Sequence, residues 1–211
     1  MQTPHWPLLD LRISVGELEL RPLVEADLAE VVQALPADLE LNPSLPGFDV
    51  PDQLRPAVVT HLEYWRSYGT WSPRAWRFHL AVRRDGELLG LQELEGNDFP
   101  ALRTVDTSSW LVGGVRGGGL GKAMRRAVLC LAFDHLGARA AITSAWHDNS
   151  ASLGVSRSLG YRPNGESFLG RGDDVDTLVH LRLTAEDWAA TDGGHGITVE
   201  GVEPCRPWFG L

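Results

Sequence analysis

The sequence predicts a single α/β domain built around a mixed β-sheet. In the first half, segments of strand length follow one another through short turns. In the second half, loop, helix and strand alternate, which is typical of crossover connections. The chain has 211 residues, of which 43% are hydrophobic and 22% charged, as in ordinary globular domains. We therefore expect one domain over residues 1–211, with 1–16 as an N-terminal strand extension and 189–211 as a tail packed on the domain.

The first half supplies most of the predicted sheet. Val24 to Asp27 carry acidic residues suited to a helix start, and Pro36 is suited to ending that helix. A later segment has apolar residues at helical spacing. The strands expected here are Leu8–Ile13, Leu18–Leu23, Trp76–Val82, Glu87–Leu94 and Thr104–Val112. The helices are Glu25–Leu35 and Asp52–Tyr68, and the connections are Asn42–Pro51, Asp85-Gly86 and Asn97–Ala101.

The second half begins with a glycine-rich loop and a helix from about Leu120 to Leu136. The buried stripe of this helix is expected to consist of Leu120, Met124, Ala127, Val128 and Leu131. A strand at Ala138–Trp146 and a helix at Asn149–Leu159, ended by Gly160, follow. The last predicted strands are Arg162–Asn164, Val175–Leu183 and, in the tail, Ile197–Val202, with a loop at Gly170–Asp174.

Composition excludes several classes of function. The net charge of −9 opposes binding to nucleic acid and to anionic membranes, which need clusters of Lys and Arg. Apolar runs are too short for a membrane span, and Met1–Asp10 lacks the pattern of a signal peptide. Cys130 and Cys205 lie far apart, so we expect neither a disulfide framework nor a metal site. These features favour a cytoplasmic protein.

The segment from Arg116 to Lys122 has four glycines in five positions and precedes a helix. Backbone N–H groups of glycine can close on a bulky anion, and a helix start adds further N–H groups and a positive dipole end. A Walker P-loop fails on spacing, because Ala123 stands where the hydroxyl residue belongs. A dinucleotide fingerprint fails as well. The segment is therefore predicted to hold a diphosphate.

The spacing R-x-x-G-x-G, at Arg116, Gly119 and Gly121, resembles the acyl-CoA signature of the GNAT superfamily of N-acetyltransferases. That resemblance implies a mostly antiparallel sheet with a V-shaped splay, whose arms here are Thr104–Val112 and Ala138–Trp146. It further implies an acyl-CoA bound by backbone groups near the splay and by the glycine loop. The implied binding residues are Trp110, Leu111, Val112, Arg116, Gly117, Gly118, Gly119, Leu120, Gly121, Lys122 and Ala123.

A second block, Asp148 to Ser152 followed by Ser158-Leu159-Gly160-Tyr161, resembles the RimJ/RimL branch of these acetyltransferases. The resemblance assigns Asn149 to the pantetheine arm of the donor. Asn149 is also a good helix N-cap. Ser152 lies one turn along and is the candidate donor of a proton or hydrogen bond to the departing thiolate. Ser156 occupies the place where many such enzymes carry a tyrosine.

Direct transfer needs a neutral amine and therefore a general base. Asp106 falls at the position of a glutamate in the related branch and is the candidate catalytic base or amine-orienting carboxylate. Glu93 and Glu95 on the neighbouring strand are rivals, and His79 and His147 are alternatives. Asp106, Ser108 and Trp110 share one strand face by alternation.

Further segments, among them His5–Ile13, Asp98–Pro100 and Cys205–Pro207, resemble a mycobacterial subgroup described as using succinyl-CoA. A succinyl group ends in a carboxylate, which needs a cation nearby. Arg103 and Arg55 are candidates for that cation.

Together these features predict an N-acyltransferase with acetyl-CoA as donor and succinyl-CoA as the alternative. A non-catalytic acyl-CoA sensor of the same fold is a further possibility. The acceptor is a primary amine of a protein lysine or N-terminus, or of a small molecule; residues Pro36–Trp76 are expected to select it. The apolar tail is compatible with a homodimer.

Overall fold

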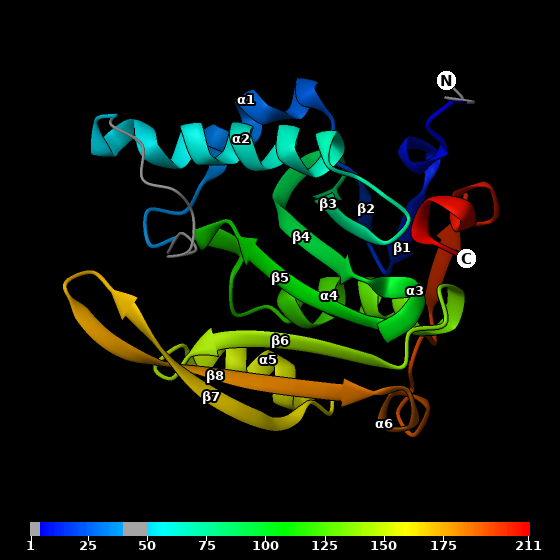
Figure 1. The fold of residues 1–211 in the computed structure, drawn as a ribbon. Helices are drawn as coiled ribbons and strands as arrows, with labels where there is room; N and C mark the ends of the chain where they lie inside the picture. The colour runs from blue at the N-terminus through cyan, green and yellow to red at the C-terminus, as the bar shows by residue number, and fades with distance from the viewer. Residues whose placement is uncertain (1–4, 40–49) are drawn as a thin grey trace.

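The computed structural model describes residues 5–39 and 50–211, and these residues build a nine-stranded sheet in the order β7-β8-β6-β5-β4-β3-β2-β1-β9. Within this part of the chain, β5 and β6 pair in parallel and every other neighbouring pair is antiparallel (Figure 1). The predicted mixed sheet is confirmed. The strands are β1 Arg12–Val15, β2 Leu18–Pro22, β3 Ala75–Arg84, β4 Glu87–Asn97, β5 Thr104–Leu111, β6 Ala140–Trp146, β7 Arg162–Arg171, β8 Asp174–Thr184 and β9 Ile197–Glu200.

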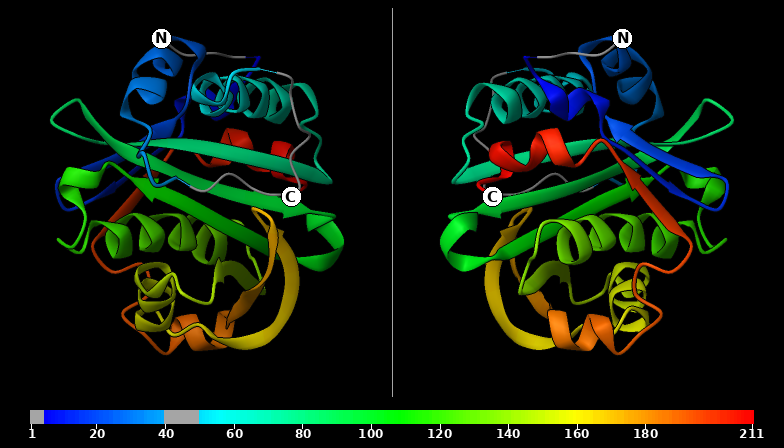
Figure 2. Two further views of the ribbon diagram at one scale, coloured as in Figure 1. Left: turned by 90° about the vertical axis from the view of Figure 1, so that its left-hand side faces the viewer. Right: turned by 90° about the vertical axis from the view of Figure 1, so that its right-hand side faces the viewer.

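Helices cover both faces of the sheet, as Figure 2 shows with α1 and α2 on one side and α4 on the other. The α-helices are α1 Leu28–Ala34, α2 Arg55–Gly69, α3 Phe99–Leu102, α4 Leu120–Cys130, α5 Ser150–Ser158 and α6 Ala185–Ala189. Short 3-10 turns lie at Pro7–Asp10, Glu25–Asp27, Asp52–Leu54, Gly113–Val115 and Glu203–Phe209, and a π-helical turn at Leu131–His135 continues α4.

The core is divided between the two faces. The larger apolar cluster contains the buried side of α4, with Met124, Ala127 and Val128 fully buried. A smaller cluster joins α1 to the opposite face of the sheet through Val31 and Ala81. Because successive strand residues point to opposite faces, this division identifies which side chains of β5 face α4 and which face α1 and α2.

The C-terminal tail adds to the sheet and to the core. Strand β9 pairs antiparallel with β1 at the edge of the sheet. Phe209 is fully buried, and its ring lies 4.8 Å from that of Trp76 and 5.7 Å from that of Trp71. Several tryptophans therefore pack the core, and the tail closes the aromatic cluster of which they are part.

Two of the expected strands differ from the structure. Pro7–Asp10 forms a 3-10 turn rather than the start of a strand, because Pro7 favours a helical first turn and Leu8 is buried beneath it. Strand β7 runs to Arg171, well beyond the predicted end at Asn164. Its side chains are mostly exposed, so no apolar alternation marks it.

The connections show smaller differences. The segment expected as a plain link at Asn97–Ala101 contains the single turn α3. The β7–β8 turn is confined to Gly172 and Asp173, inside the loop predicted at Gly170–Asp174. Most of the predicted loop Asn42–Pro51 lies outside the described residues.

Candidate active site

Strands β5 and β6 diverge, and the gap between them is the centre of the site. Their parallel pairing covers three positions, the last of which sets Asp106 opposite Ile142. One residue further, Thr143 Oγ1 donates to the Thr107 carbonyl over 2.8 Å. We call this cross-link the apex of the splay. Both strands continue beyond it, so the gap opens toward their carboxyl ends, as expected.

The glycine-rich segment lies at the open end of the gap and begins α4. Gly117 and Gly119 have φ angles of +83° and +82°, a conformation that favours glycine. Gly119 is the N-cap of α4, and its carbonyl accepts from the Lys122 and Ala123 N–H groups, which leaves the Leu120 and Gly121 amides at the helix start without an intrahelical acceptor. A Cβ placed on either glycine would meet no atom within 4 Å. Free amides, a helix start and open space together suit a diphosphate.

Gly121 lies between the glycine-rich segment and the gap. A Cβ built on Gly121 would lie 3.6 Å from Val155 Cγ2 of α5 and 3.8 Å from Leu111 Cδ1 of β5. The side chains of Leu111 and Val155 therefore flank the helix at its second residue. We call this constriction the neck of the splay.

The two cations beside the glycines lie in different surroundings. Arg116 donates from Nη1 and Nη2 to the Asp38 carboxylate over 2.5 and 2.8 Å, and from Nε to the Leu111 carbonyl. Its guanidinium is thus engaged within the protein. Lys122 is exposed at the first turn of α4. The backbone amides consequently carry more of the expected diphosphate binding than Arg116 does.

Strands β4 and β5 approach closely where the pantetheine arm is expected. A Cβ on Gly90 would lie 2.2 Å from the Trp110 carbonyl oxygen, so this contact requires glycine. The Val112 N–H donates to the Leu89 carbonyl over 2.9 Å and is already bonded inside the protein. Trp110 packs against the smaller apolar cluster on the α1 and α2 face.

The second sequence block forms the start of α5. Asn149 is its N-cap, and its side-chain oxygen accepts from the Ser152 N–H over 3.0 Å. Ser152 is partly exposed. Ser156 is buried and donates to the Ser152 carbonyl over 3.1 Å, as a satisfied helix hydroxyl does. Of these two serines, Ser152 is the one that is partly exposed.

On the α1 and α2 face, strands β4 and β5 and helix α2 bring four carboxylates together. Glu95 pairs with Asp106 across β4 and β5, Glu93 pairs with Ser108, and Glu63 reaches down from α2. We call Glu63, Glu93, Glu95 and Asp106 the acidic strip. Arg77 bonds Glu63 and Glu95 over 2.5 and 2.8 Å and neutralises part of its charge.

Asp106 and Glu93 differ in protonation. Burial raises the pKa of Asp106 to about 6, with the charges of Glu95 and Glu93 adding to the rise and the Thr107 N–H opposing it. Burial also acts to raise the pKa of Glu93, but the hydrogen bond and charge of His79, the charge of Arg77 and the hydrogen bond from Ser108 together outweigh it, and the net pKa is lowered. Glu93 Oε2 lies 3.1 Å from His79 Nδ1. Asp106 is thus the carboxylate suited to exchange a proton near neutral pH.

The alternative bases lie elsewhere or are already engaged. His79 is held by Glu93, and its Nε2 is buried without a hydrogen-bond partner among the described residues. His147 is 2.9 Å from Asp176, on β8. Glu95 accepts two bonds from Arg77.

Sequence reasoning missed a buried cation in the gap. Arg125, one turn after Gly121, is 4% exposed and donates to Thr143 Oγ1 of β6 and to Ser109 Oγ of β5. The cations proposed from sequence do not lie there. Arg103 is the C-cap residue of α3, and its guanidinium lies over the Phe99 ring. Arg55 pairs with Asp52. The four-residue spacing from Gly121 to Arg125 is the one sequence signal for this position. Residues four apart lie on the same face of a helix, so Arg125 is expected on the face that Gly121 presents to the neck.

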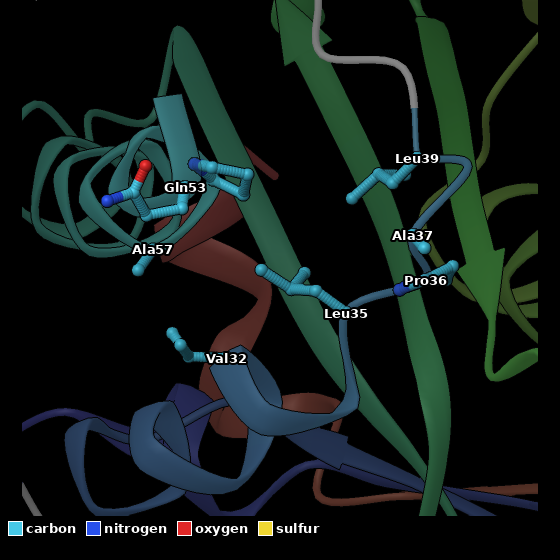
Figure 3. A pocket seen from close by; sticks show the side chains of 8 residues that line it. Val32, Leu35, Pro36, Ala37, Leu39, Gln53 and Ala57 are labelled. Atoms are coloured by element: carbon cyan, nitrogen blue, oxygen red, sulfur yellow. The ribbon is translucent and has the colours of Figure 1, made fainter. Parts of the chain in front are cut away.

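Two cavities lie on the α1 and α2 side. The first, of about 240 Å³, lies between the end of α1 and the start of α2 (Figure 3). Its lining is mainly apolar: Val32, Leu35, Pro36, Ala37, Leu39, Gln53, Pro56 and Ala57. The second includes Arg77 and Glu95, at the end of the acidic strip. Both fall mostly within the segment expected to select the acceptor.

A mixed sheet that splays beside a glycine-rich helix start is the architecture of acyl-CoA-dependent N-acyltransferases. A family model described as acetyltransferase (GNAT) domain matches residues 17–162. The chain therefore belongs to the GNAT acetyltransferase family. Among the part of the chain that is described, no helix is long and apolar enough to cross a membrane.

Solved structures show the same fold at low identity. Mycobacterium smegmatis RimJ in complex with CoA-disulfide is 20% identical, with a TM-score of 0.66 over 89% of this chain and 97% of that one. RimL, a ribosomal L7/L12 α-N-protein acetyltransferase in complex with coenzyme A, is 17% identical, with a TM-score of 0.65 over 82% and 97%. A spermidine N-acetyltransferase SpeG chimera from Vibrio cholerae and hSSAT is 12% identical, with a TM-score of 0.64 over 83% and 100%.

Proposed function

We propose that this protein transfers an acetyl group from acetyl-CoA to a primary amine by direct attack in a ternary complex. The observation that carries the proposal is the splay itself, with the glycine loop at its open end and Asp106 at its closed end. The donor enters from the α4 side and the amine from the α1 and α2 side. The two substrates then meet in the gap between β5 and β6.

Donor binding rests on the glycine loop and the neck. Amides from Gly117 to Gly121 and the positive end of α4 hold the diphosphate. Asn149 caps α5 with its side-chain oxygen. Its side-chain amide nitrogen then donates to the pantetheine arm. Trp110 and Leu111 supply backbone groups along β5.

The acceptor side is acidic, which favours a cationic amine. The acidic strip contains four carboxylates, two of which accept hydrogen bonds from Arg77 and one of these also pairs with Arg66, and it lies on the face where Asp106 projects. Asp106 accepts a proton from the incoming ammonium, directly or through water. The amine lone pair then forms the new C–N bond at the thioester carbon. As the C–S bond breaks, its electron pair leaves on sulfur and the Ser152 hydroxyl donates a hydrogen bond to it, while the second proton lost by the acylated nitrogen passes through water to the thiolate.

A covalent enzyme intermediate is disfavoured by the cysteines. Cys130 and Cys205 are both buried. Burial raises the pKa of Cys130 to about 12 and that of Cys205 to about 11. Neither thiol is a ready nucleophile.

For the acceptor we propose a chemical class, primary amines, and not one compound. Similar folds act on a ribosomal-protein N-terminus and on spermidine, according to their names. We propose a protein N-terminus, a lysine or a small amine, selected by the residues around the two cavities. Succinyl-CoA is a second candidate donor, and the observation that favours it is the buried Arg125 in the gap.

The test is release of free thiol from acetyl-CoA and, in parallel, from succinyl-CoA. A peptide with a free N-terminus, a peptide with one lysine and a blocked N-terminus, and spermidine serve as acceptors, with mass spectrometry of the products. We expect thiol release matched by one acylated amine. Tight CoA binding without release for every pair would contradict the enzyme and favour an acyl-CoA sensor.

A further inference from the structure

Arg125 is buried on α4 and donates to hydroxyl groups rather than to a carboxylate. Its Nη1 donates to Thr143 Oγ1 over 3.3 Å, and its Nη2 donates to Ser109 Oγ over 3.1 Å. The hydroxyl of the buried Tyr161 lies against the same guanidinium. All three of these partners are neutral, because burial raises the pKa of Tyr161 above its ordinary value.

A second buried arginine in the same protein has a different arrangement. The guanidinium of Arg83 pairs directly with Asp27 at 3.2 Å and with Glu30 at 2.5 Å. Burying a charge without an opposite charge is costly, because hydroxyl dipoles replace only part of the lost hydration. Arg125 therefore differs from Arg83 in that any carboxylate it stabilises is reached through other groups.

A continuous chain of hydrogen bonds joins Arg125 to Asp106. After the bond from Arg125 to Thr143, Thr143 Oγ1 donates to the Thr107 carbonyl over 2.8 Å. The Thr107 N–H then donates to Asp106 Oδ1 over 2.6 Å. Every donor in this chain points toward the carboxylate, and bonds that are aligned in this way polarise one another. The buried cation and the carboxylate are thus connected across β5, although their side chains lie on opposite faces of the sheet.

The chain passes through the apex of the splay. The pair of Asp106 with Ile142 is the last position at which β5 and β6 pair in parallel, and the Thr143 hydroxyl joins the two strands one residue later. Arg125 belongs to the helix that begins at the glycine loop. The chain therefore connects the helix of the donor face to the carboxylate of the acceptor face, at the closed end of the gap.

We propose that Arg125 is a positioning residue for Asp106, whose carboxylate it holds at the closed end of the gap through Thr143 and Thr107. This role rests on the proposed function of Asp106 as the base. The Thr107 N–H fixes one carboxylate oxygen of Asp106, and the second oxygen is left to accept the proton of the incoming amine. Arg125 itself touches neither substrate.

The charges around Asp106 act on it in opposite directions. Burial is the largest cause of its raised pKa, and the charges of Glu95 and Glu93 add to the rise, whereas the Thr107 N–H and the charge of Arg125 lower it. The other charged or titratable groups near the acidic strip are Arg77 and His79 on β3 and Glu63 and Arg66 on α2. Loss of Arg125, or a break in the chain, should therefore raise the pKa of Asp106 further.

The test is an NMR titration of protein labelled with 13C-aspartate, in which the Asp106 carboxyl signal is identified by its absence from Asp106→Asn. Arg125→Met removes the cation, and Thr143→Val removes one link of the chain while keeping the shape of the side chain. Arg126→Met is the matched control for charge, since Arg126 is the next residue and bonds the Gly193 and His195 carbonyls. Ser109→Ala is the second control, because it removes a partner of Arg125 that lies outside the chain.

We expect the titration midpoint of Asp106 to move upward by about half a pH unit or more in Arg125→Met, and in the same direction but less far in Thr143→Val. The acidic limb of kcat/KM should move with it. In Arg126→Met and Ser109→Ala we expect both to stay where they are in the native protein.

An unchanged midpoint in folded Arg125→Met would overturn the proposal, and so would an equal shift in Arg126→Met, because the effect would then be one of overall charge. Should Arg125→Met fail to fold, Thr143→Val decides alone, and an unchanged midpoint in it contradicts the chain. A shifted midpoint in a protein that transfers no acyl group would instead leave the link to Asp106 in place and refute the proposed function.

Discussion

The two faces of the splayed sheet are built by different means. On the α4 face, main-chain groups of consecutive residues form the glycine loop, and the nearest side-chain charge in the gap is the cation Arg125. On the α1 and α2 face, carboxylates from three separate elements form the acidic strip. An anionic donor suits the first face and a cationic amine suits the second. In the proposed reaction the sheet therefore separates the two substrates by charge, and they meet where β5 and β6 part.

The largest expected effect concerns the donor face. Gly119→Val places a Cβ at a φ of +82° and in the space the diphosphate would occupy, so CoA affinity should fall more than about 100-fold by calorimetry. Gly172→Val is the matched control, because it has a φ of +63° in the distant β7–β8 turn and imposes similar backbone strain. Equal CoA affinity in both variants would mean that the loop does not hold the diphosphate.

The next effect concerns the acceptor face. Asp106→Asn removes the proposed base and should lower kcat about 100-fold or more, with donor Kd nearly unchanged. In the native enzyme kcat/KM should fall as pH drops through about 6, because the carboxyl with its raised pKa becomes protonated. The variant should lose this limb of the pH profile.

Glu93→Gln is the control for Asp106. The pKa of Glu93 is lowered and it is held by His79, so its loss should leave the limb near pH 6 in place. A limb that disappears with Glu93 and survives in Asp106→Asn would move the base to Glu93.

A smaller effect is expected where the two faces meet. Ser152→Ala should lower kcat about 10-fold, because a thiolate leaves readily even without a hydrogen-bond donor. Ser158→Ala on the same helix is the control, since its hydroxyl bonds the Val155 carbonyl within α5. Rates that are equal in the two variants would remove Ser152 from the reaction.

The last effect is on stability rather than on binding or rate. An Asp106 pKa of about 6, against 3.8 for an ordinary aspartate, means that ionised Asp106 destabilises the folded state. Asp106→Asn should raise the free energy of unfolding at pH 7.5 by up to about 3 kcal/mol. The gain is full above about pH 6 and vanishes below about pH 4, where the carboxyl is protonated in both states. Urea unfolding at several pH values measures it, and a loss of stability at pH 7.5 would contradict the raised pKa.

The sequence predicted the local structure of the α4 face better than that of the α1 and α2 face, and the reason is physical. A glycine loop at a helix start is formed by neighbours in the chain, so Gly119 and Gly121 could be identified by spacing alone. The acidic strip depends on the register of β3, β4 and β5, which sets Glu95 beside Asp106 and Arg77. Alternation placed Asp106 on the correct face with Trp110, but it could not show that Glu63 reaches the strip from α2.

The buried position of Arg125 and the full length of β7 were not predicted from the sequence, and the two failures have similar causes. Apart from the spacing of Arg125 from Gly121, Arg125 and Arg126 look alike in sequence, and the rotation of α4 against β6 buries the first and leaves the second partly exposed. Strand β7 is an exposed edge strand, so its residues carry no apolar pattern, whereas its partner β8 was predicted. Packing between distant parts of the chain decides both the burial of Arg125 and the extent of β7, and the local sequence pattern does not.

The decisive experiment is a crystal structure with bound CoA. We expect the diphosphate to contact the amides between Gly117 and Gly121, and the sulfur to lie between β5 and β6 near Ser152. CoA bound away from the splay, with the glycine loop facing solvent, would contradict this expectation.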